Sequence, residues 1–438
     1  MKIAILGAGL TGLTAAHYLA EKGHQISIFE KEAAVGGLAV GFKEKDWEWT
    51  LEKHYHHFFT NDHELIGLVK KLGLSQNIIY PKSLTSVLFT GKIYPFNNAE
   101  NILGFSPLGF INRLRLGIVI VLLKTLPSWL GIRLENLTAV FFAQKLFGKE
   151  VFNVVWKPLL SSKFNNYDHA VNASWLWARI KKRTLKLGYL KGGFQMLAEA
   201  LSAKIQKQEV KLFLNSEISD VVKQENNFRI NLVNKKASCL FDCVLSTLPT
   251  PVFLKLFNRL PPNLSNNLKS IPHLHALNLV LETKEPLLSK TYWLNINEND
   301  FPFLCAVQHT NFIDKKYYNN HHVLYISNYL PYNHPYFRKS PEELLNIYLP
   351  YLQKINPNFK LAKNGQEFKI YNLKLFAGLF AQPVFLRNYS KIRPYFSTPV
   401  ENLYFANLDC VYPWDRGTNY AVELGRKAAE LITNPRKI

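Results

Sequence analysis

A glycine-rich loop near the start of the chain has the composition and spacing to hold a dinucleotide pyrophosphate. It reads Gly7-Ala8-Gly9-Leu10-Thr11-Gly12 and follows the apolar run Lys2–Leu6. In such a loop the first glycine permits a tight turn, the second lets phosphates approach the backbone, and the third lets the following helix pack closely. Unpaired N–H groups at the helix start then face the phosphates. The predicted contacts are Gly7, Gly9, Leu10, Thr11 and Gly12.

An acidic residue, Glu30, stands at the end of the next predicted strand, Gln25–Phe29. It follows the glycine loop by about twenty residues, the usual distance for a ribose-binding acid. A carboxylate there can accept hydrogen bonds from both hydroxyls of an adenosine ribose. It would repel a 2′-phosphate, so NADP is disfavoured at this site.

A second glycine pair separates FAD from NAD. The segment Phe29-Glu30-Lys31-Glu32 leads to Gly36-Gly37-Leu38-Ala39, and in this order the motifs resemble those of the amine oxidase and protoporphyrinogen oxidase superfamily of FAD enzymes. The resemblance implies FAD as the cofactor, with the glycine pair passing over its pyrophosphate and ribityl. It also implies an adenine contact after the predicted strand Lys211–Leu214. The residues that it adds to the site are Lys31, Gly37, Leu38 and Ile218.

The C-terminal segment extends this resemblance. Asn402–Asp409 resembles the superfamily segment "nLyfAG" followed by an acid, with Asn407 in place of the usual glycine. The resemblance implies that Asp409 contacts the phosphate–ribityl region of the flavin. The next helix, which includes Tyr420–Gly425, would point its N-terminus at the isoalloxazine, where it stabilises negative charge on a reduced flavin. That N-terminus contains Thr418 and Asn419.

One branch of the superfamily is similar to nearly the whole chain. It is a group of bacterial flavoproteins described as protoporphyrinogen-oxidase-like. The resemblance is carried by residues 52–59, 174–183, 188–194, 292–297 and 412–419. These segments indicate the family and leave the reaction open, because one fold can carry many chemistries.

Three histidines, His54, His56 and His57, form a conspicuous polar group. No other Cys or His cluster would complete a metal site, so the sequence predicts none. The related UDP-galactopyranose mutases have a similar segment over the flavin ring, and His57 is its best match. His57 would then accept a substrate proton during hydride transfer or polarise the flavin. The alternative is that two of the three are packed, hydrogen-bonded loop residues.

Two arginines are the other candidates for chemistry, together with His57. Arg179 lies in an aromatic helical segment with Trp175 and Trp177. Since arginine binds carboxylate or phosphate through two parallel hydrogen bonds, Arg179 either holds an anionic substrate group or belongs to a solvated basic helix face. Arg416 either stabilises the reduced flavin or pairs with its neighbour Asp415 to fix the last loop.

The elements that must position these residues form an interrupted α/β domain. A strand, a helix over Leu13–Lys22 and a second strand predict a parallel βαβ unit at the start. Residues 100–187 have a helical pattern, whereas 275–330 alternate like strands of a second sheet. We predict a Rossmann-type FAD-binding domain with an inserted α+β substrate domain. The first comprises residues 1–90, 188–260 and 395–438, and the second 91–187 and 261–394.

The charge balance favours an anionic partner. The chain has 53 Lys and Arg against 32 Asp and Glu, a net charge of +21. These basic residues are spread along the chain without a basic tail, zinc-finger spacing or RNA-binding signature, so we expect no nucleic-acid partner. Four cysteines without a CxxC motif fit a reducing cytoplasm. The apolar start is too short for the core of a signal peptide.

Residues 105–133 leave two interpretations open. They combine large apolar residues and Trp129 with Arg113, Arg115, Lys124 and Arg133. The apolar run is too short to cross a bilayer, which needs about 20 residues. It suits either a helix pair on the inner face of a membrane or a buried helix pair of the substrate domain. The location is therefore predicted as cytoplasmic, with peripheral membrane binding as the alternative.

The leading hypothesis is an FAD-dependent oxidoreductase. It would take hydride from an apolar or amphipathic anionic substrate, such as protoporphyrinogen or an isoprenoid, and pass the electrons to oxygen or quinone. A second hypothesis is a flavin-dependent isomerase of a sugar nucleotide or lipid-linked sugar. The third is a flavoprotein without catalytic activity in a membrane assembly. The oligomeric state is left open.

Overall fold

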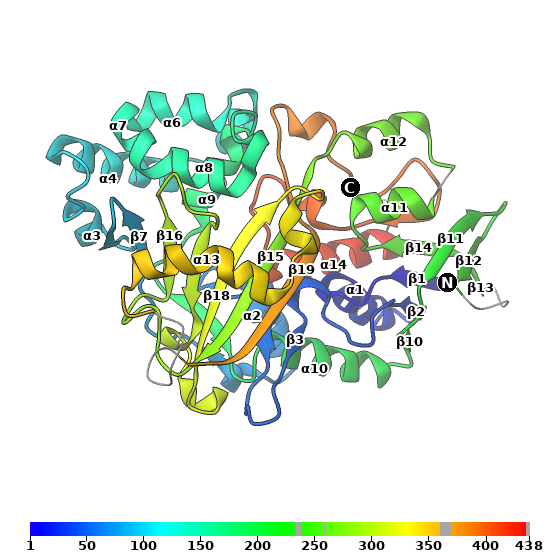
Figure 1. The fold of residues 1–438 in the computed structure, drawn as a ribbon. Coiled ribbons are helices and arrows are strands. Elements are labelled where there is room, and N and C mark those ends of the chain that lie inside the picture. Colours follow the sequence, from blue (N-terminus) through cyan, green and yellow to red (C-terminus); the bar gives the residue numbers. More distant parts are fainter. Residues whose placement is uncertain (234–238, 258, 360–368, 435–438) are drawn as a thin grey trace.

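A computed structural model describes residues 1–233, 239–257, 259–359 and 369–434 (Figure 1). One layer is a parallel five-stranded sheet, on the right of Figure 1, with the strand order β10-β2-β1-β14-β20. Its strands are β1 (Lys2–Leu6), β2 (Gln25–Phe29), β10 (Lys211–Phe213), β14 (Cys243–Ser246) and β20 (Leu403–Phe405). A parallel sheet with crossover helices confirms the predicted Rossmann-type architecture.

Three helices position the ligand-binding edge of this sheet. They are α1 (Leu10–Ala20), α10 (Phe194–Gln206) and α14 (Thr418–Thr433), and α1 contacts both of the others. A Cβ on Gly425 would lie 2.4 Å from the Thr11 carbonyl oxygen. Glycine at 425 therefore allows α14 to pack directly against the first turn of α1.

A second sheet has seven strands in the order β19-β15-β18-β17-β16-β7-β8. All neighbours are antiparallel except β16 and β7. Helix α13 (Pro341–Ile355) lies across this sheet in Figure 1 and shares a buried cluster with it that includes Leu279 and Tyr348. The strands are β7 (Thr85–Phe89), β8 (Lys92–Pro95), β15 (His273–Thr283), β16 (Trp293–Ile296), β17 (Cys305–Gln308), β18 (His322–Leu330) and β19 (Ile370–Pro383).

A helical region projects beyond the second sheet, at the upper left of Figure 1. It agrees with the helical pattern predicted over 100–187. Its members are α3 (Ala99–Leu103), α4 (Phe110–Thr125), α5 (Ser128–Arg133), α6 (Ala139–Phe147), α7 (Lys149–Val151), α8 (Lys157–Phe164) and α9 (Ala173–Lys182).

The remaining elements connect these layers. Two further three-stranded sheets consist of β11 (Ile218–Lys223), β12 (Phe228–Leu232) and β13 (Cys239–Phe241), and of β5 (Phe58–Phe59), β9 (Leu187–Leu190) and β6 (Ile78–Ile79). The short strands β3 (Gly41–Phe42) and β4 (Leu51–Glu52) pair with each other. The other helices are α2 (His63–Lys71), α11 (Thr250–Leu256) and α12 (Pro262–Lys269).

The structure differs locally from the sequence prediction at two boundaries and in one additional strand. The first helix begins at Leu10, earlier than predicted, because the glycine loop ends in its first turn. Strand β7 belongs to the second sheet through its parallel pairing with β16, so residues 85–89 lie on the other side of the predicted boundary at residue 90. Strand β19 was not among the predicted strands. The rest of the domain division stays a prediction.

Candidate functional site

The glycine loop has the backbone that a phosphate site requires. Gly7 has a φ of +101°, in the region that favours glycine. A Cβ on Gly12 would lie 2.1 Å from the Gly7 carbonyl oxygen, so α1 can begin here only with glycine at this position. Gly9 precedes the helix, and within the described residues no side chain caps it. The first-turn N–H groups are therefore available to an anion.

Glu30 is held beside this loop. Its Oε2 accepts a hydrogen bond from the Ala8 N–H at 2.8 Å, and its Oε1 accepts one from the Glu32 N–H at 3.0 Å. The carboxylate is half-buried at the end of β2, where a ribose-binding acid is predicted. Lys31 is exposed and pairs with Glu32 at 3.3 Å, so its predicted contact with the cofactor would be made at the outer edge of the site.

The second glycine pair touches the first loop through its backbone. The Gly36 N–H donates to the Ala8 carbonyl at 2.9 Å, and Gly9 and Gly36 form a parallel bridge. A Cβ on Gly37 would lie 3.1 Å from Gly9 Cα. The two turns thus meet as bare backbone at the N-terminus of α1, with Leu38 half-buried beside them.

The start of α14 also fits an anionic group. Thr418 and Asn419 are buried, and no side chain of the described residues caps the helix. Thr418 Oγ1 is buried without a hydrogen-bond partner in the part of the chain that the structure describes. Asn419 is engaged, because its Oδ1 accepts from the Leu65 N–H at 3.1 Å. An open helix terminus with an unpaired hydroxyl suits a flavin oxygen, so the residues present fit FAD.

Two further residues that are predicted to contact the cofactor, Asp409 and Ile218, lie among protein groups. Asp409 is buried, and its carboxylate lies 2.9 Å from His273 Nε2 and accepts a hydrogen bond from the Thr250 hydroxyl. Ile218 is half-buried at the start of β11. Their contacts with FAD stay predictions.

Four cationic side chains lie close to Asp415, a residue of the loop that precedes α14. The Asp415 carboxylate accepts hydrogen bonds from Lys163 Nζ at 3.1 Å and from Arg179 Nη1 at 3.2 Å. Within the described residues it is the one carboxylate that contacts any of the four. We call this group the cation cluster; it comprises Lys163, Arg179, Arg183 and Arg416.

Burial and crowding of like charge perturb the pKa values of this cluster. Burial lowers the pKa of Lys163 to about 7, although Asp415 opposes the shift. The Arg179 charge, reinforced by burial, lowers the pKa of Arg183 to about 9. Burial lowers the pKa of Arg416 to about 10. Buried cations that share one carboxylate are a mark of a site for an anionic ligand.

Arg416 is oriented by neutral partners. Its Nη1 donates to Gln382 Oε1 at 2.7 Å, its Nη2 donates to the Tyr329 hydroxyl, and the guanidinium lies 4.4 Å from the Tyr329 ring centroid. The suggested side-chain pair of Arg416 with Asp415 is wrong, because Arg416 contacts that carboxylate through its backbone N–H and not through its guanidinium. The solvated-face interpretation of Arg179 is also wrong, since its side chain is only 14% exposed.

The three histidines are neutral at pH 7. Burial, with Arg183, His56 and Arg179 nearby, lowers the pKa of His57 to about 3. Burial likewise lowers the pKa of His54 to about 3 and that of His56 to about 4. His57 Nδ1 lies 3.2 Å from the Tyr292 hydroxyl, whereas His54 Nδ1 lies 2.6 Å from Asn278 Nδ2. A neutral, weakly basic imidazole is better suited to polarising a bound group than to taking up a proton.

Lys163 and Arg183 are the members of the cluster that were not predicted as site residues, along with Gln382 and Tyr329, the partners of Arg416. The case of Lys163 shows why. Its one local signal is spacing: Leu160 and Phe164, three residues before and one after, are buried on the same side of α8. A lysine on a buried helix face needs a charged partner. Its partner Asp415 lies 252 residues away in the sequence, so no motif reveals the pair.

Comparison with known proteins agrees with this geometry. Residues 10–433 match the family described as flavin-containing amine oxidoreductases. Coproporphyrinogen III oxidase of Staphylococcus aureus is 26% identical over 299 residues, which cover 59% of this chain and 63% of that enzyme. A probable zeta-carotene desaturase of Synechococcus elongatus is 39% identical over 85 residues, covering 19% of this chain and 17% of that protein. The chain thus matches less than two thirds of either relative's length.

The fold has a solved counterpart along the whole chain. The structure of a reduced UDP-galactopyranose mutase superposes with a TM-score of 0.76 and 16% sequence identity, covering 100% of this chain and 94% of that one. At this identity the likeness shows the fold alone.

Proposed function

Because this chain belongs to the flavin-containing amine oxidoreductase family and is an FAD-dependent oxidoreductase, we propose that its substrate is an apolar or amphipathic molecule with anionic groups. The cation cluster carries this proposal. With four cations around one carboxylate, it attracts carboxylates or phosphates and repels a protonated amine. A porphyrinogen, which combines a large apolar ring with carboxylates, has the required chemistry. The name of the Staphylococcus aureus relative supports the same class.

Aromatic side chains supply the apolar part of such a site. The His57 ring lies 5.6 Å from the Trp293 ring and 6.0 Å from that of Tyr292, and Tyr55 packs edge-on against Trp293 at 4.7 Å. These rings border the histidines, while Arg179 and Arg183 act electrostatically on His57 from the cluster side. The arrangement would hold an anionic group at the cations and an apolar ring against the aromatic side chains.

The reaction divides between cofactor and protein. Bound FAD supplies the acceptor for a hydride taken from the substrate. The protein would hold the substrate's anionic groups through Arg179 and Arg183 and keep the site poor in water. His57 would polarise the reacting group as a neutral hydrogen-bonding partner of Tyr292. Oxygen or a quinone would then reoxidise the flavin.

A second candidate is a flavin-dependent isomerase of a sugar nucleotide or lipid-linked sugar. The cation cluster suits a diphosphate as well as a carboxylate, and the fold matches a reduced UDP-galactopyranose mutase. Such an enzyme causes no net redox change. It would therefore turn over only with flavin that has been reduced beforehand.

An anaerobic half-reaction separates the two functions. Coproporphyrinogen or protoporphyrinogen is mixed with the FAD-loaded protein without oxygen, while flavin absorbance and porphyrin fluorescence are followed together. Forming a porphyrin removes six electrons from the porphyrinogen and each FAD accepts two, so we expect flavin bleaching with one porphyrin formed for every three flavins reduced. Unchanged flavin with both compounds, together with turnover of a sugar diphosphate only after dithionite reduction, would establish the isomerase instead.

The cation cluster also predicts how binding depends on pH. Lys163, with a pKa of about 7, loses its charge as the pH rises, whereas Arg183 and Arg416 stay protonated and His57 stays neutral between about pH 6 and 8. Since only the protonated lysine attracts an anion, affinity falls as pH increases. We expect the Kd for coproporphyrin, measured by fluorescence quenching, to rise about tenfold over this range.

The matched control is Lys163→Met, which keeps a similar volume and removes the charge. It should bind the porphyrin weakly at both pH values, so the pH dependence disappears. A pH dependence of the same size in Lys163→Met would assign it to the ligand and contradict this role of Lys163.

A further inference from the structure

Helix α4 presents an apolar face that the described chain leaves uncovered. Ile111 is 80% exposed, and Ile118, Val121 and Leu122 are each 60% exposed. Their spacing places them on one side of the helix, while Leu116 and Leu123 on the opposite side are buried. The helix therefore has one apolar side in the protein and a second apolar side in solvent.

This distribution differs from that of an ordinary surface helix. A helix that contacts water on one side normally carries polar residues there, and a helix that is apolar all round is normally buried in protein or lipid. Large contiguous apolar surfaces on soluble proteins mark docking sites. The buried-core interpretation of residues 105–133 is thus wrong for the outer side of α4.

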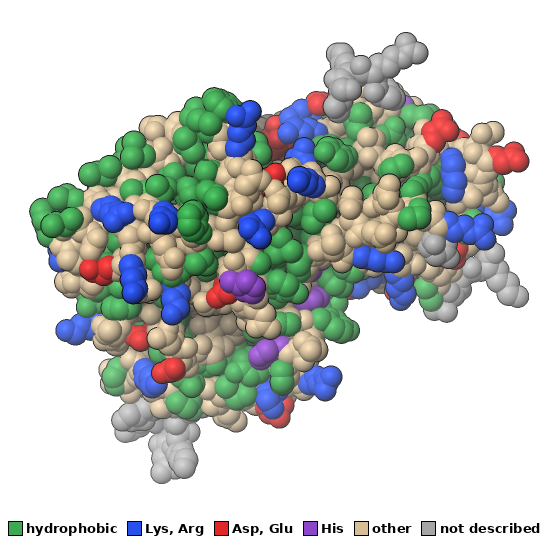
Figure 2. All heavy atoms as spheres, turned by 90° about the horizontal axis from the view of Figure 1, so that it is seen from above, with side chains coloured by type: hydrophobic (Ala, Val, Ile, Leu, Met, Phe, Trp, Pro, Cys, Tyr) green, Lys and Arg blue, Asp and Glu red, His purple; other side chains and the backbone are tan. Residues whose placement is uncertain are grey.

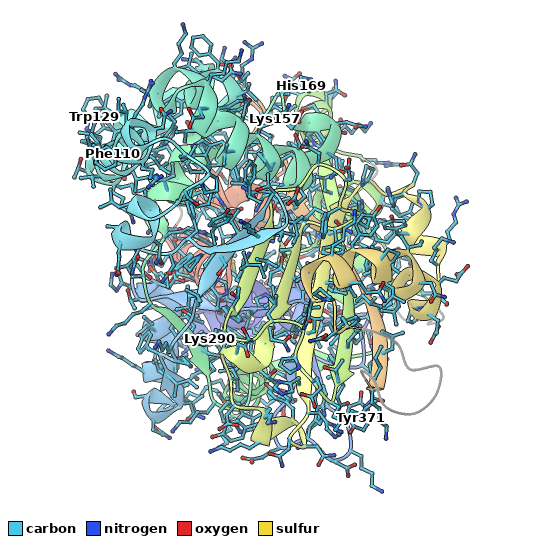
Figure 3. The ribbon with its side chains drawn as sticks, turned by 60° about the vertical axis from the view of Figure 1, so that its left-hand side comes forward. Phe110, Trp129, Lys157, His169, Lys290 and Tyr371 are labelled. Carbon is cyan, nitrogen blue, oxygen red and sulfur yellow. The ribbon has the colours of Figure 1, made fainter. Side chains whose placement is uncertain are left out.

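Helix α5 extends the exposed surface. Trp129 is 59% exposed, and the Arg133 guanidinium lies 5.3 Å from its ring centroid. Phe110 and Trp129 both lie at the outer edge of the helical region in Figure 3. We call this surface the α4–α5 face; it comprises Ile111, Ile118, Val121, Leu122 and Trp129.

The charges around this face fit an anionic surface. Residues 110–133 contain four basic residues and no acidic residue. Arg115, Lys124 and Arg133 are exposed, and of these Arg115 Nε donates to the Leu146 carbonyl at 2.7 Å and Lys124 Nζ donates to the Arg183 carbonyl at 2.6 Å. Figure 2 shows Lys and Arg side chains interspersed with hydrophobic ones over the helical region on the left. Exposed aliphatic side chains, a tryptophan and cations on one surface are the features that bind a helix to the interface of an acidic bilayer.

The helices are suited to lie on a bilayer. In the described part of the chain, no single helix has both the length and the apolar composition to cross one. The pair Phe110–Thr125 and Ser128–Asn136 meets both conditions only together, and it is bent by 109°. A bent pair with its apolar side outward can bury that side at the depth of the lipid headgroups.

One helix connects this face to the cation cluster. Trp177 Nε1 on α9 donates to the Leu123 carbonyl at 3.1 Å, and Lys181 Nζ donates to the Leu126 carbonyl at 2.8 Å. The same helix carries Arg179, which pairs with Asp415. Helix α9 thus lies between the exposed face and the site, so a docked protein would hold its anion site one helix away from the bilayer.

From these observations we propose that the α4–α5 face docks on an anionic lipid bilayer. Its apolar side chains enter the headgroup region and Arg133, beside Trp129, faces the acidic lipids, while Arg115 and Lys124 add positive charge near the face from groups bound to backbone carbonyls. The docking itself stands on the exposed face. Only its use, to take an amphipathic substrate from the lipid phase, rests on the proposed function.

Vesicle co-sedimentation of the FAD-loaded full chain tests the docking. The protein is mixed with phosphatidylcholine vesicles that contain roughly one third phosphatidylglycerol, and with vesicles of phosphatidylcholine alone. We expect the protein to bind the acidic vesicles, with an affinity for the neutral vesicles that is about tenfold lower. The double variant Ile118→Glu, Val121→Glu should lose at least about tenfold in affinity for acidic vesicles. Both positions point outward, so folding and the FAD spectrum should be retained.

A matched control and a direct probe complete the experiment. Leu240→Glu changes a residue that is 50% exposed on β13, at the opposite end of the molecule in Figure 1, and should bind like wild type. Acidic vesicles should shift tryptophan emission to the blue in the wild type, and Trp129→Phe should remove most of that shift. Wild type that stays in the supernatant, or a double variant that binds equally well, would overturn the proposal.

A second copy of the chain is the competing occupant. In that case the protein without vesicles would sediment as a dimer, the double variant would sediment as a monomer, and vesicles would bind neither. That outcome would also overturn lipid docking. The half-reaction with a soluble porphyrinogen uses no vesicles, so its failure would reject the proposed substrate and leave the docking result intact.

Discussion

Gly12→Ala should abolish FAD retention and lower the free energy of unfolding by roughly 3 kcal/mol. The added Cβ would lie 2.1 Å from the Gly7 carbonyl oxygen and 3.2 Å from Ile5 Cγ2. Backbone cannot yield as a side-chain tip can, so α1 must move away from β1 and its N-terminus from the phosphates. The flavin absorbance of the purified variant and its urea unfolding curve give the two measurements.

The same substitution elsewhere separates this clash from a general effect of alanine. Gly67 lies within α2, and an added Cβ there would meet nothing within 4 Å. Gly67→Ala should retain FAD and gain about 0.5–1 kcal/mol, because alanine favours a helix more than glycine does. Gly12→Ala with full flavin content and the stability of the wild type would refute the assigned role of this loop.

The nucleotide-binding half of the site could be predicted because its signals are local. Strands β1 and β2 coincide with the apolar runs at Lys2–Leu6 and Gln25–Phe29, each ended by a residue that breaks the pattern. The glycine loop and Glu30 belong to one βαβ unit, so residues that are close in the sequence are also close in space.

The cation cluster could be predicted only in part. The contact of Arg179 with Asp415 joins residues 236 positions apart, and that of Lys163 with Asp415 joins residues 252 apart. Arginine within an aromatic helix suggested an anion site, but nothing local says whether such a residue faces solvent or protein. The resulting side-chain geometry depends on how α8, α9 and the last loop meet.

Strand β19 shows a second limit. An edge strand that is half-exposed on both faces has no clean apolar alternation, and most of its residues from Ile370 to Leu379 are half-exposed. Its pairing with β15 is shifted between Leu274 and Ala276, and Phe380 takes a φ of +56°. A bulge of this kind breaks the period of two on which strand prediction depends.

For α4 the sequence left both a core and a membrane-surface interpretation open, because both require an apolar helix. The exposed fractions of its two sides decide against a fully buried helix. Which side is exposed depends on the position of the neighbouring helices, and the periodicity of residues 110–125 does not reveal that position.

The second large effect is expected at Arg416. Arg416→Gln in the FAD-loaded protein should lower the rate constant of flavin reduction by about 100-fold. Its side-chain hydrogen bonds go to the neutral groups of Gln382 and Tyr329, so its charge is free to act on a bound anion and on negative charge that develops during hydride transfer. Stopped-flow absorbance with a porphyrinogen measures the rate. Loss of the cation should also lower the flavin midpoint potential by about 30 mV, equivalent to a tenfold change for a two-electron couple.

Three further variants distinguish this charge effect from a loss of loop structure. Arg416→Lys keeps the charge without the planar fork, so it should restore most of the midpoint potential and only part of the rate. Arg338→Gln removes an exposed arginine and should match wild type in both. Gln382→Ala removes a hydrogen-bond partner of Arg416 and leaves the charge in place. If Gln382→Ala reproduced the full loss of rate in Arg416→Gln while neither variant shifted the potential, Arg416 would serve to fix the loop before α14. A shift in potential that depends only on the charge at position 416 is the result that electrostatic stabilisation requires, because packing alone does not discriminate between oxidised and reduced flavin.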